Sequence, residues 1–403
     1  MSATTDAFIF DGLRSAFGRQ GGVLSRIRPD DLLGQVIRAL MAKTGIDPTA
    51  IEDVIAGCAC QAGEDARNVA RHGALMGGLP VEVAAQTVNR LCGSGMAAVI
   101  DASRAIRLGD GELMIAGGVE SMTRAPFVVA KSEQAFGRDF KVYDSAIGAR
   151  FPNPKVIAAY GGDTMPETAD NIARDLAIGR EESDAFAARS QASYEAARAA
   201  GFFEDEITAV TVDQGREAPA LEVTADEHPR PDSTMAALTK LRPLAADGVV
   251  TAGNASGIND GAAALLLGTE AAGARFGLKP RARIVAAAVA GVEPRVMGLG
   301  PVPAARKALA RAGLSLADMD VIEINEAFAT QVLGCLKQLD LAYDDARVNP
   351  NGGAIAVGHP LGASGARITL TALRELERRG GRYALVSMCI GIGQGIALIV
   401  EKV

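Results

Sequence analysis

The chain has 403 residues, of which 48% are hydrophobic and 22% charged, and its net charge at pH 7 is −7. This length predicts two or three domains of roughly 150 residues each. The acidic balance argues against general affinity for nucleic acid or for an anionic membrane surface. No apolar run approaches the ~20 residues of a membrane-spanning helix. The N-terminus lacks a signal-peptide pattern, so we expect no membrane association and a cytoplasmic location.

The five cysteines are scattered through the chain, an odd number that is typical of reduced thiols in a cytosolic protein. Cys58 and Cys60 alternate at the end of an expected strand, so they should face opposite sides and not pair. The sequence has no C-x-x-C motif, and its three histidines are far apart. We therefore expect no metal site.

In chain order, "IEDVIAGC" from Ile51 predicts a buried strand, and "VNRLCGSGMAAV" then places Cys92 between an extended segment and a helix. Ser94 should open that helix, which ends before the strand "ELMIAGG". A thiol at a helix N-terminus meets unpaired backbone N–H groups and the positive end of the helix dipole. Both favour the nucleophilic thiolate. Two other interpretations stay open here: a small buried residue at a tight turn, and a weak dinucleotide-binding pattern that lacks its partner acid.

Residues 121–250 form a more polar region that holds many of the prolines. Within it, "ETADNIARDL" and "EESDAFAARSQASYEAARAAG" are typical of helices. We interpret this region as an inserted domain that caps a site or builds an oligomer interface. A simple surface elaboration is the alternative.

The strand–helix–strand pattern then occurs a second time. "DMDVIEIN" from Asp318 repeats the first strand, and Ser364 opens a second helix before "RYALVSM". The second copy carries ten extra residues, which include "GGAIAVGHPLG". Two copies of this pattern predict a duplicated α/β fold with largely buried sheets.

Three residues of the second copy are candidate partners for Cys92. His359 lies in a glycine-rich loop, Cys389 at a strand end, and Asn325 where a strand gives way to a helix. Taken singly, they are equally typical of a surface turn, a buried strand cysteine and a helix cap. Their matching positions in the two copies favour convergence on one site.

The chain resembles the thiolase family over essentially its whole length. The resemblance rests on motifs in the family's order: "NRLCGSGM", "GGVESM", "TAGNASGINDGAAA", "NEAFA", "NGGAIAVGHPLGASGAR" and "CIGIGQG". It implies two βαβαβαββ halves in a layered αβαβα core, with the first half at 1–120 and 251–272, an inserted loop domain at 121–250, and the second half at 273–403. It also implies a homodimer or homotetramer. Coenzyme A and acyl-CoA would be substrates, and no cofactor would be bound permanently.

The resemblance also implies roles for individual residues. Cys92 matches the nucleophile, His359 its base, and Cys389 the thiol that moves protons to and from the substrate. Asn325 matches the residue that holds a water in an oxyanion hole shared with His359, and the N–H groups of Cys92 and Gly391 match a second hole. Five further residues match positions that contact coenzyme A or its pantetheine arm: Ser256, Gly257, Arg230, Met165 and Phe328.

Details of the sequence favour a degradative member that acts on 3-oxoadipyl-CoA in aromatic catabolism. Thr164 precedes Met165 where biosynthetic members usually have His-Met, and Arg150 is placed to meet a distal carboxylate. Ala149 departs from the Trp expected in that subgroup. The alternatives are a biosynthetic acetoacetyl-CoA thiolase and, more remotely, a non-catalytic acyl-CoA-binding relative.

Overall fold

The computed structural model describes residues 5–216 and 218–403. Its main feature is an eleven-stranded mixed sheet in the order β13-β14-β15-β12-β1-β11-β5-β3-β4, with β2 paired to β11 and β8 to β1. The strands are β1 (Phe8–Ser15), β2 (Gly18–Arg19), β3 (Asp53–Gly57), β4 (Ala84–Val88), β5 (Leu113–Ser121), β8 (Ile207–Thr208), β11 (Asn259–Gly268), β12 (Ala282–Gly291), β13 (Val321–Ile324), β14 (Tyr383–Ile390) and β15 (Gln394–Lys402). β1 and β12 join the two halves of the sheet through the residue pairs Phe8 with Arg283 and Ile9 with Ala282.

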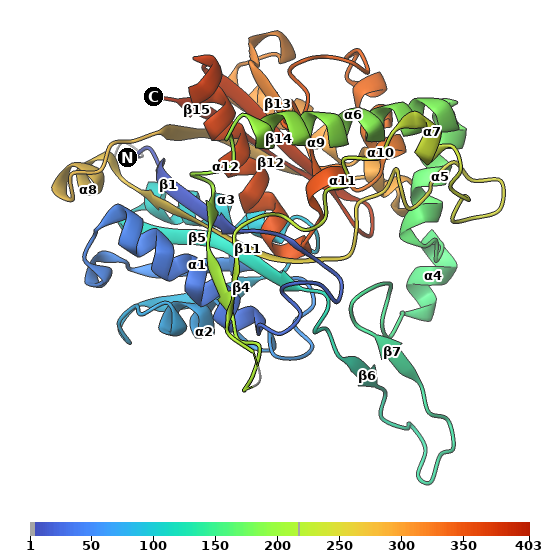
Figure 1. Ribbon diagram of the computed structural model, residues 1–403, viewed down its shortest axis with the longest axis horizontal. Helices are drawn as coiled ribbons and strands as arrows, with labels where there is room; N and C mark the ends of the chain where they lie inside the picture. Colours follow the sequence, from blue (N-terminus) through green and yellow to red (C-terminus); the bar gives the residue numbers. More distant parts are fainter. Residues whose placement is uncertain (1–4, 217) are drawn as a thin grey trace.

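Helices form three layers around the two halves of this sheet (Figure 1). α1 (Pro29–Thr44) and α2 (Val69–Met76) cover the outer face of the first half, while α9 (Pro301–Ala312) covers that of the second. α3 (Ser94–Leu108) and α12 (Leu361–Arg379) contact each other and strands of both halves. The expected helix–sheet–helix–sheet–helix layering is therefore confirmed, with α3 and α12 in the middle.

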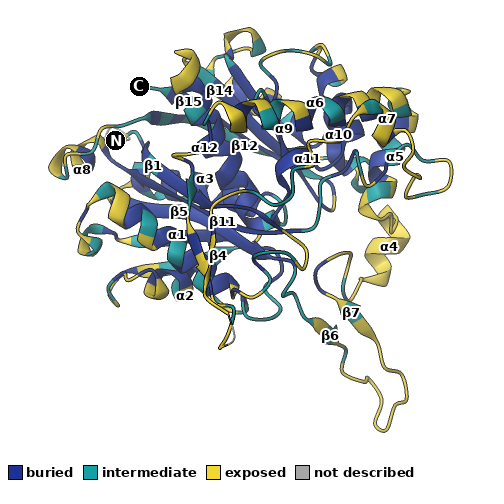
Figure 2. Cartoon of the chain, in the orientation of Figure 1, coloured by how far each residue is buried: buried dark blue, intermediate teal, exposed yellow. Residues whose placement is uncertain are grey.

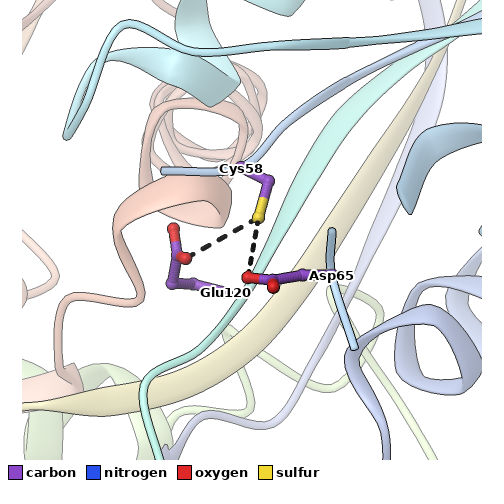
Figure 3. Close-up of side chains that lie close together, drawn as sticks. All are labelled: Cys58, Asp65 and Glu120. Atoms are coloured by element: carbon purple, nitrogen blue, oxygen red, sulfur yellow. Dashed lines mark hydrogen bonds between the residues drawn. The ribbon is translucent and has the colours of Figure 1, made fainter. Parts of the chain in front are cut away.

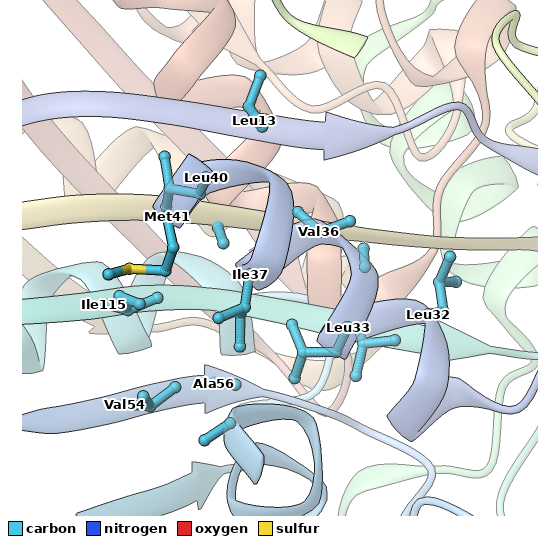
Figure 4. Close-up of a cluster of buried hydrophobic side chains, with 14 of the residues drawn as sticks. Leu13, Leu32, Leu33, Val36, Ile37, Leu40, Met41, Val54, Ala56 and Ile115 are labelled. Atoms are coloured by element: carbon cyan, nitrogen blue, oxygen red, sulfur yellow. The ribbon is translucent and has the colours of Figure 1, made fainter. Parts of the chain in front are cut away.

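The amphipathic helix α1 shows how an outer layer is built. Its apolar side chains lie on one stripe and pack on Val54, Ala56 and Ile115 of the sheet (Figure 4). Such i, i+3, i+4 spacing is what a core-facing helix requires. α3 and α12 differ because they are buried on nearly all sides, as the dark central elements of Figure 2 show.

The region between β5 and β11 is a set of short elements that reach over the core. They are β6 (Phe127–Val129), β7 (Val142–Asp144), α4 (Pro154–Tyr160), α5 (Met165–Leu176), α6 (Arg180–Ala199), β9 (Val210–Val212), β10 (Leu221–Val223) and α7 (Met235–Leu238). The β6–β7 hairpin extends away from the body (Figure 1). The region is not separate from the core, because its β8 pairs with β1.

The repeated pattern appears as β3, α3 and β5 in the first half and β13, α12 and β14 in the second. α3 begins at Ser94 as expected. The expectation that Ser364 opens the second helix was wrong, because α12 already begins at Leu361, directly after its N-cap Pro360. The remaining elements are α8 (Glu270–Arg275), α10 (Ala329–Gln338), α11 (Ala354–Val357) and short 3-10 turns at Pro48–Ala50, Pro294–Leu299 and Leu316–Asp318. Across the described residues, no helix is long and apolar enough to span a membrane.

Candidate active site

Cys92 lies in a tight turn that the Ser94 side chain locks. The Ser94 hydroxyl donates to the carbonyl of Leu91 at 2.6 Å and accepts from the N–H of Arg90 at 2.8 Å. Leu91 has a φ of 48°, a left-handed conformation that few non-glycine residues adopt. Gly93 must be small, because a Cβ there would stand 2.7 Å from Ile390. The turn thereby lies directly against the end of β14.

The sulfur of Cys92 is held as a thiol. Backbone N–H groups of Gly391 and of Cys92 itself hydrogen-bond to it, which lowers its pKa, but loss of water around the sulfur outweighs them and raises the pKa to about 11. The expected stabilisation of a thiolate by the turn is therefore present but is outweighed by burial. Desolvation penalises the charged form more than two N–H groups stabilise it, so the thiol needs a base.

His359 is the candidate base that the sequence predicts. Its Nδ1 lies 2.7 Å from the Ser364 hydroxyl, which donates to the carbonyl of Pro360 at 2.9 Å. The Ser364 hydroxyl uses its proton in the bond to Pro360, so it can only accept from His359. Nδ1 of His359 therefore carries the hydrogen, and Nε2 carries the lone pair. Burial, aided by the charge of Arg367, lowers the pKa of His359 to about 3, so the resting imidazole is neutral.

The loop that carries His359 is held by the first half of the molecule. Asn259 of β11 accepts the backbone N–H of His359 at 2.9 Å and donates to Gly18 at 3.0 Å. Gly358 has a φ of 101°, and a Cβ there would lie 2.5 Å from the Asn259 side chain. Glycine is therefore required at position 358, where the loop backbone approaches the Asn259 side chain.

Asn325 lies beside the imidazole. Its Nδ2 is 3.4 Å from Nε2 of His359, and its Oδ1 is buried without a protein partner. A buried amide oxygen of this kind usually binds an ordered water. The backbone N–H of Asn325 bonds to Ser387 of β14 at 3.0 Å, which fixes its place at the end of β13.

Cys389 completes the group from the second half. It is 1% exposed near the end of β14, and burial raises its thiol pKa well above the ordinary value, with the charge of Cys92 as the next largest cause. It packs with Phe328, Met297 and Ala255 in one apolar cluster. The structure thus places Cys92 beside Gly391 and Cys389, packs Phe328 with Cys389, and sets Asn325 beside His359.

The residues expected to hold coenzyme A are more dispersed. Arg230 lines a cavity of about 390 Å³, together with His228, Leu238 and Gly253. Gly257 abuts this cavity, since a Cβ there would lie 2.3 Å from His228. Ser256 is half-buried, and its N–H bonds to Ala327 at 2.9 Å.

Two other predicted residues are placed less centrally. Met165 begins α5 and is 39% exposed, with no recorded contact to this cavity. Arg150 donates to the carbonyls of Ser145 (3.1 Å) and Cys60. Part of its guanidinium is therefore engaged by backbone.

Sequence reasoning passed over His228, Asn259 and Glu120. Burial, followed by the charge of Arg230, lowers the pKa of His228 to about 4. Glu120 stands in an otherwise apolar strand, and Asn259 follows directly on "NASGI". For Glu120, a carboxylate inside a buried apolar run is the signal that could have found it.

Comparison with known proteins agrees with this architecture and site. The profile of the thiolase N-terminal domain matches residues 7–271, and that of the thiolase C-terminal domain matches residues 278–402. The chain belongs to the thiolase family, and it is an acyltransferase that acts on coenzyme A thioesters.

Among its relatives, the 3-oxoadipyl-CoA/3-oxo-5,6-dehydrosuberyl-CoA thiolase of Escherichia coli K12 is 56% identical over 400 residues, covering 99% of this chain and 100% of the relative. The Bacillus anthracis acetyl-CoA acetyltransferase superposes with a TM-score of 0.93 at 38% identity, with full coverage of both chains. Human mitochondrial 3-ketoacyl-CoA thiolase in complex with CoA superposes with a TM-score of 0.91 at 41% identity, covering 100% of this chain and 99% of that one.

Proposed function

We propose that this thiolase is degradative and splits a dicarboxylic 3-oxoacyl-CoA, 3-oxoadipyl-CoA, with coenzyme A into acetyl-CoA and a shortened acyl-CoA. The observation that carries the proposal is the 56% identity to a relative named for 3-oxoadipyl-CoA, against 46% to the acetyl-CoA acetyltransferase of Chromobacterium violaceum. The convergence of two thiols and a neutral imidazole supplies the chemistry.

In the first step, His359 Nε2 takes the proton of the Cys92 thiol, and the sulfur attacks the 3-keto carbon. The oxyanion that forms is stabilised by Asn325, through its water, or by the N–H groups of Cys92 and Gly391. The bond between C2 and C3 then breaks. The shortened acyl group stays on Cys92, and the departing enolate takes a proton from Cys389 to become acetyl-CoA.

In the second step, coenzyme A gives its thiol proton to the Cys389 thiolate. Its sulfur attacks the acyl-Cys92 thioester, and the acyl group leaves on coenzyme A. The Cys92 thiolate then recovers the proton held by His359. All protons are thereby returned to their starting positions. The strongly raised pKa of Cys389 fits a thiol that spends its resting state protonated.

We assign the coenzyme A handle to the cavity that Arg230 lines beside Ser256 and Gly257. A guanidinium suits the phosphates of an anionic substrate even on an acidic protein, because the attraction is local. Arg230→Ala should raise the KM for coenzyme A more at low salt than at high salt. An unchanged KM would remove Arg230 from the site. Met165 and Phe328 would line the pantetheine arm, with Phe328 already packed beside Cys389.

The discriminating experiment is a thiolysis panel of acetoacetyl-, 3-oxohexanoyl- and 3-oxoadipyl-CoA. We expect the highest kcat/KM for 3-oxoadipyl-CoA, by about one to two decades if Arg150 pairs with the distal carboxylate. Arg150→Ala should then erase that preference and leave acetoacetyl-CoA unaffected. An equal loss on both substrates would show instead that Arg150 only holds the Ser145 and Cys60 carbonyls. A preference for acetoacetyl-CoA would favour the biosynthetic alternative.

We further propose that the chain works as a homodimer or homotetramer. The β6–β7 region exposes large apolar side chains: Phe127 at 74%, Phe136 at 102% and Phe140 at 73%. Patches of this kind mark interaction surfaces. Light scattering coupled to size-exclusion chromatography gives the mass directly, and a monomer at micromolar concentration would contradict the proposal.

A further inference from the structure

Glu120 is a buried carboxylate that the reaction steps above do not use. It lies in β5 and is fully buried among apolar residues. Its oxygens accept three backbone N–H groups, from Ala59 at 2.9 Å, Cys60 at 2.9 Å and Gly362 at 2.8 Å. A side chain this enclosed has no role in surface solubility.

The three partners belong to the two halves. Ala59 and Cys60 follow β3 in the first half, whereas Gly362 is the second residue of α12, three positions after His359. At the same place α12 crosses the first half with almost no space. A Cβ on Gly362 would lie 2.3 Å from the carbonyl of Val119, and one on Gly95 would lie 2.5 Å from the carbonyl of Gly362.

We propose that the ionised carboxylate of Glu120 is a positioning residue for the reaction: it fixes the N-terminus of α12, and with it His359, against the Cys92 turn. A carboxylate can satisfy several donors at once, and charge-assisted bonds of this kind are about twice as strong as neutral ones. Its negative charge also lies at the positive end of the α12 dipole. Protonation would remove that charge. It would also turn a carboxyl O–H, which is a donor, toward backbone N–H groups that are themselves donors.

The groups around Glu120 explain when it ionises. The Cys58 thiol lies between two carboxylates, 3.7 Å from Glu120 and 3.5 Å from Asp65 (Figure 3). Asp65 accepts the N–H groups of Gln61 and Gly63 at 3.0 and 2.9 Å. The Cys60 and Cys92 thiols are the other titratable neighbours. Burial, followed by the charge of Asp65, raises the pKa of Glu120 to about 7.

Cys58, Asp65 and Glu120 also have the spacing of a metal-binding group among the described residues. Five backbone N–H groups already point at the two carboxylates. Such donors repel a cation, so hydrogen bonding accounts for the cluster. The sign of the pH effect follows. Glu120 carries its charge above pH 7 and loses it as the pH falls through that value.

The test is Glu120→Gln, which keeps the size of the side chain but turns an NH₂ group toward backbone donors. We expect kcat at pH 8 to fall about 10- to 100-fold, since small misplacements of a catalytic group have effects of this size. The KM for coenzyme A should stay within about twofold. Wild-type kcat should fall as the pH drops through about 7, and the variant should lack this step.

The matched control is Glu375→Gln. Glu375 is a buried carboxylate on α12 itself, bonded to Asn351, Arg378 and Arg379 at the far end of the helix. The Glu375→Gln variant should have a lower free energy of unfolding but should keep the fall in kcat near pH 7. If Glu120→Gln does not fold, Asp65→Asn tests the proposal instead. Removing the charge of Asp65 should move the fall in kcat to lower pH. Wild-type kcat in Glu120→Gln, a step that persists there, or a step unmoved in Asp65→Asn would each overturn the proposal. None of these results depends on the acyl chain used.

Discussion

The turn around Cys92 and the loop around His359 occupy matching places in the two halves but are built differently. The Cys92 turn is held by its own neighbours, through the Ser94 hydroxyl. The His359 loop is held by the other half, through Asn259 and through Glu120 at Gly362. The first half therefore presents a self-contained nucleophile, whereas the second half presents a base whose position depends on assembly of the whole chain.

The largest expected effect comes from the self-contained side. Cys92→Ala should lower kcat on the order of 10⁶-fold, because no other group can carry the acyl chain. Mass spectrometry after incubation with acetyl-CoA should find no acetyl-enzyme. Cys335→Ala is the control, since Cys335 is also a buried thiol but packs in the outer layer of the second half. An acetyl group on Cys389 would reverse the assignment.

Cys389→Ala separates proton transfer from nucleophilic attack. The variant should still acetylate Cys92, but exchange of the acetyl-CoA α-hydrogens in deuterated water should fall by about 10²- to 10⁴-fold, the usual worth of a positioned acid–base group. NMR follows the exchange. Normal exchange in the variant would place the proton transfer on another residue.

The pH dependence of alkylation shows whether the Cys92 turn needs its partner loop. The thiol pKa is raised above its ordinary value, so thiolate is scarce at neutral pH and grows as the pH rises toward about 11. Inactivation by iodoacetamide without substrate should accelerate about tenfold per pH unit between pH 7 and 10, as the thiolate fraction does. A plateau below pH 8 would mean that the resting turn already holds a thiolate.

The smallest effect is on the contact between α3 and α12. A Cβ on Gly365 would lie 2.2 Å from the N of Met96, so Gly365→Ala should cost about 1–3 kcal/mol of unfolding free energy by overpacking. Gly179→Ala is the control, because a Cβ there meets only the Glu182 side chain at 3.5 Å. Urea denaturation measures both. Equal midpoints would show that the helix pair can move apart without cost.

The fold could be predicted from the sequence because local sequence patterns indicate its strands and helices. The short apolar runs at β3, β5, β13 and β14 are typical of buried strands. Cys92, His359 and Cys389 could be named because glycine-rich turns follow or precede each of them, and Asn325 because a strand gives way to a helix there. That they share one site needed the repeat and the family resemblance, because they are up to 297 positions apart (389 − 92).

What escaped prediction depends on packing between distant segments. The protonation of Cys92 is set by how much water its neighbours exclude, and no local sequence pattern records that quantity. The start of α12 at Leu361 depends on Pro360 as its N-cap and on Glu120 at Gly362. Arg150 was expected to meet a distal carboxylate, but the carbonyls of Ser145 and of Cys60, which lies 90 positions earlier, already accept from its guanidinium.

The position of β1 has a consequence for how the protein is made. This strand is translated well before its neighbours, β11 at Asn259–Gly268 and β12 at Ala282–Gly291. At roughly 5–20 residues per second, the nascent strand waits on the order of 10 to 50 seconds for its partners. During synthesis the N-terminal half therefore exposes an apolar strand with unpaired edges, and its sheet closes only once the inserted region has also been translated.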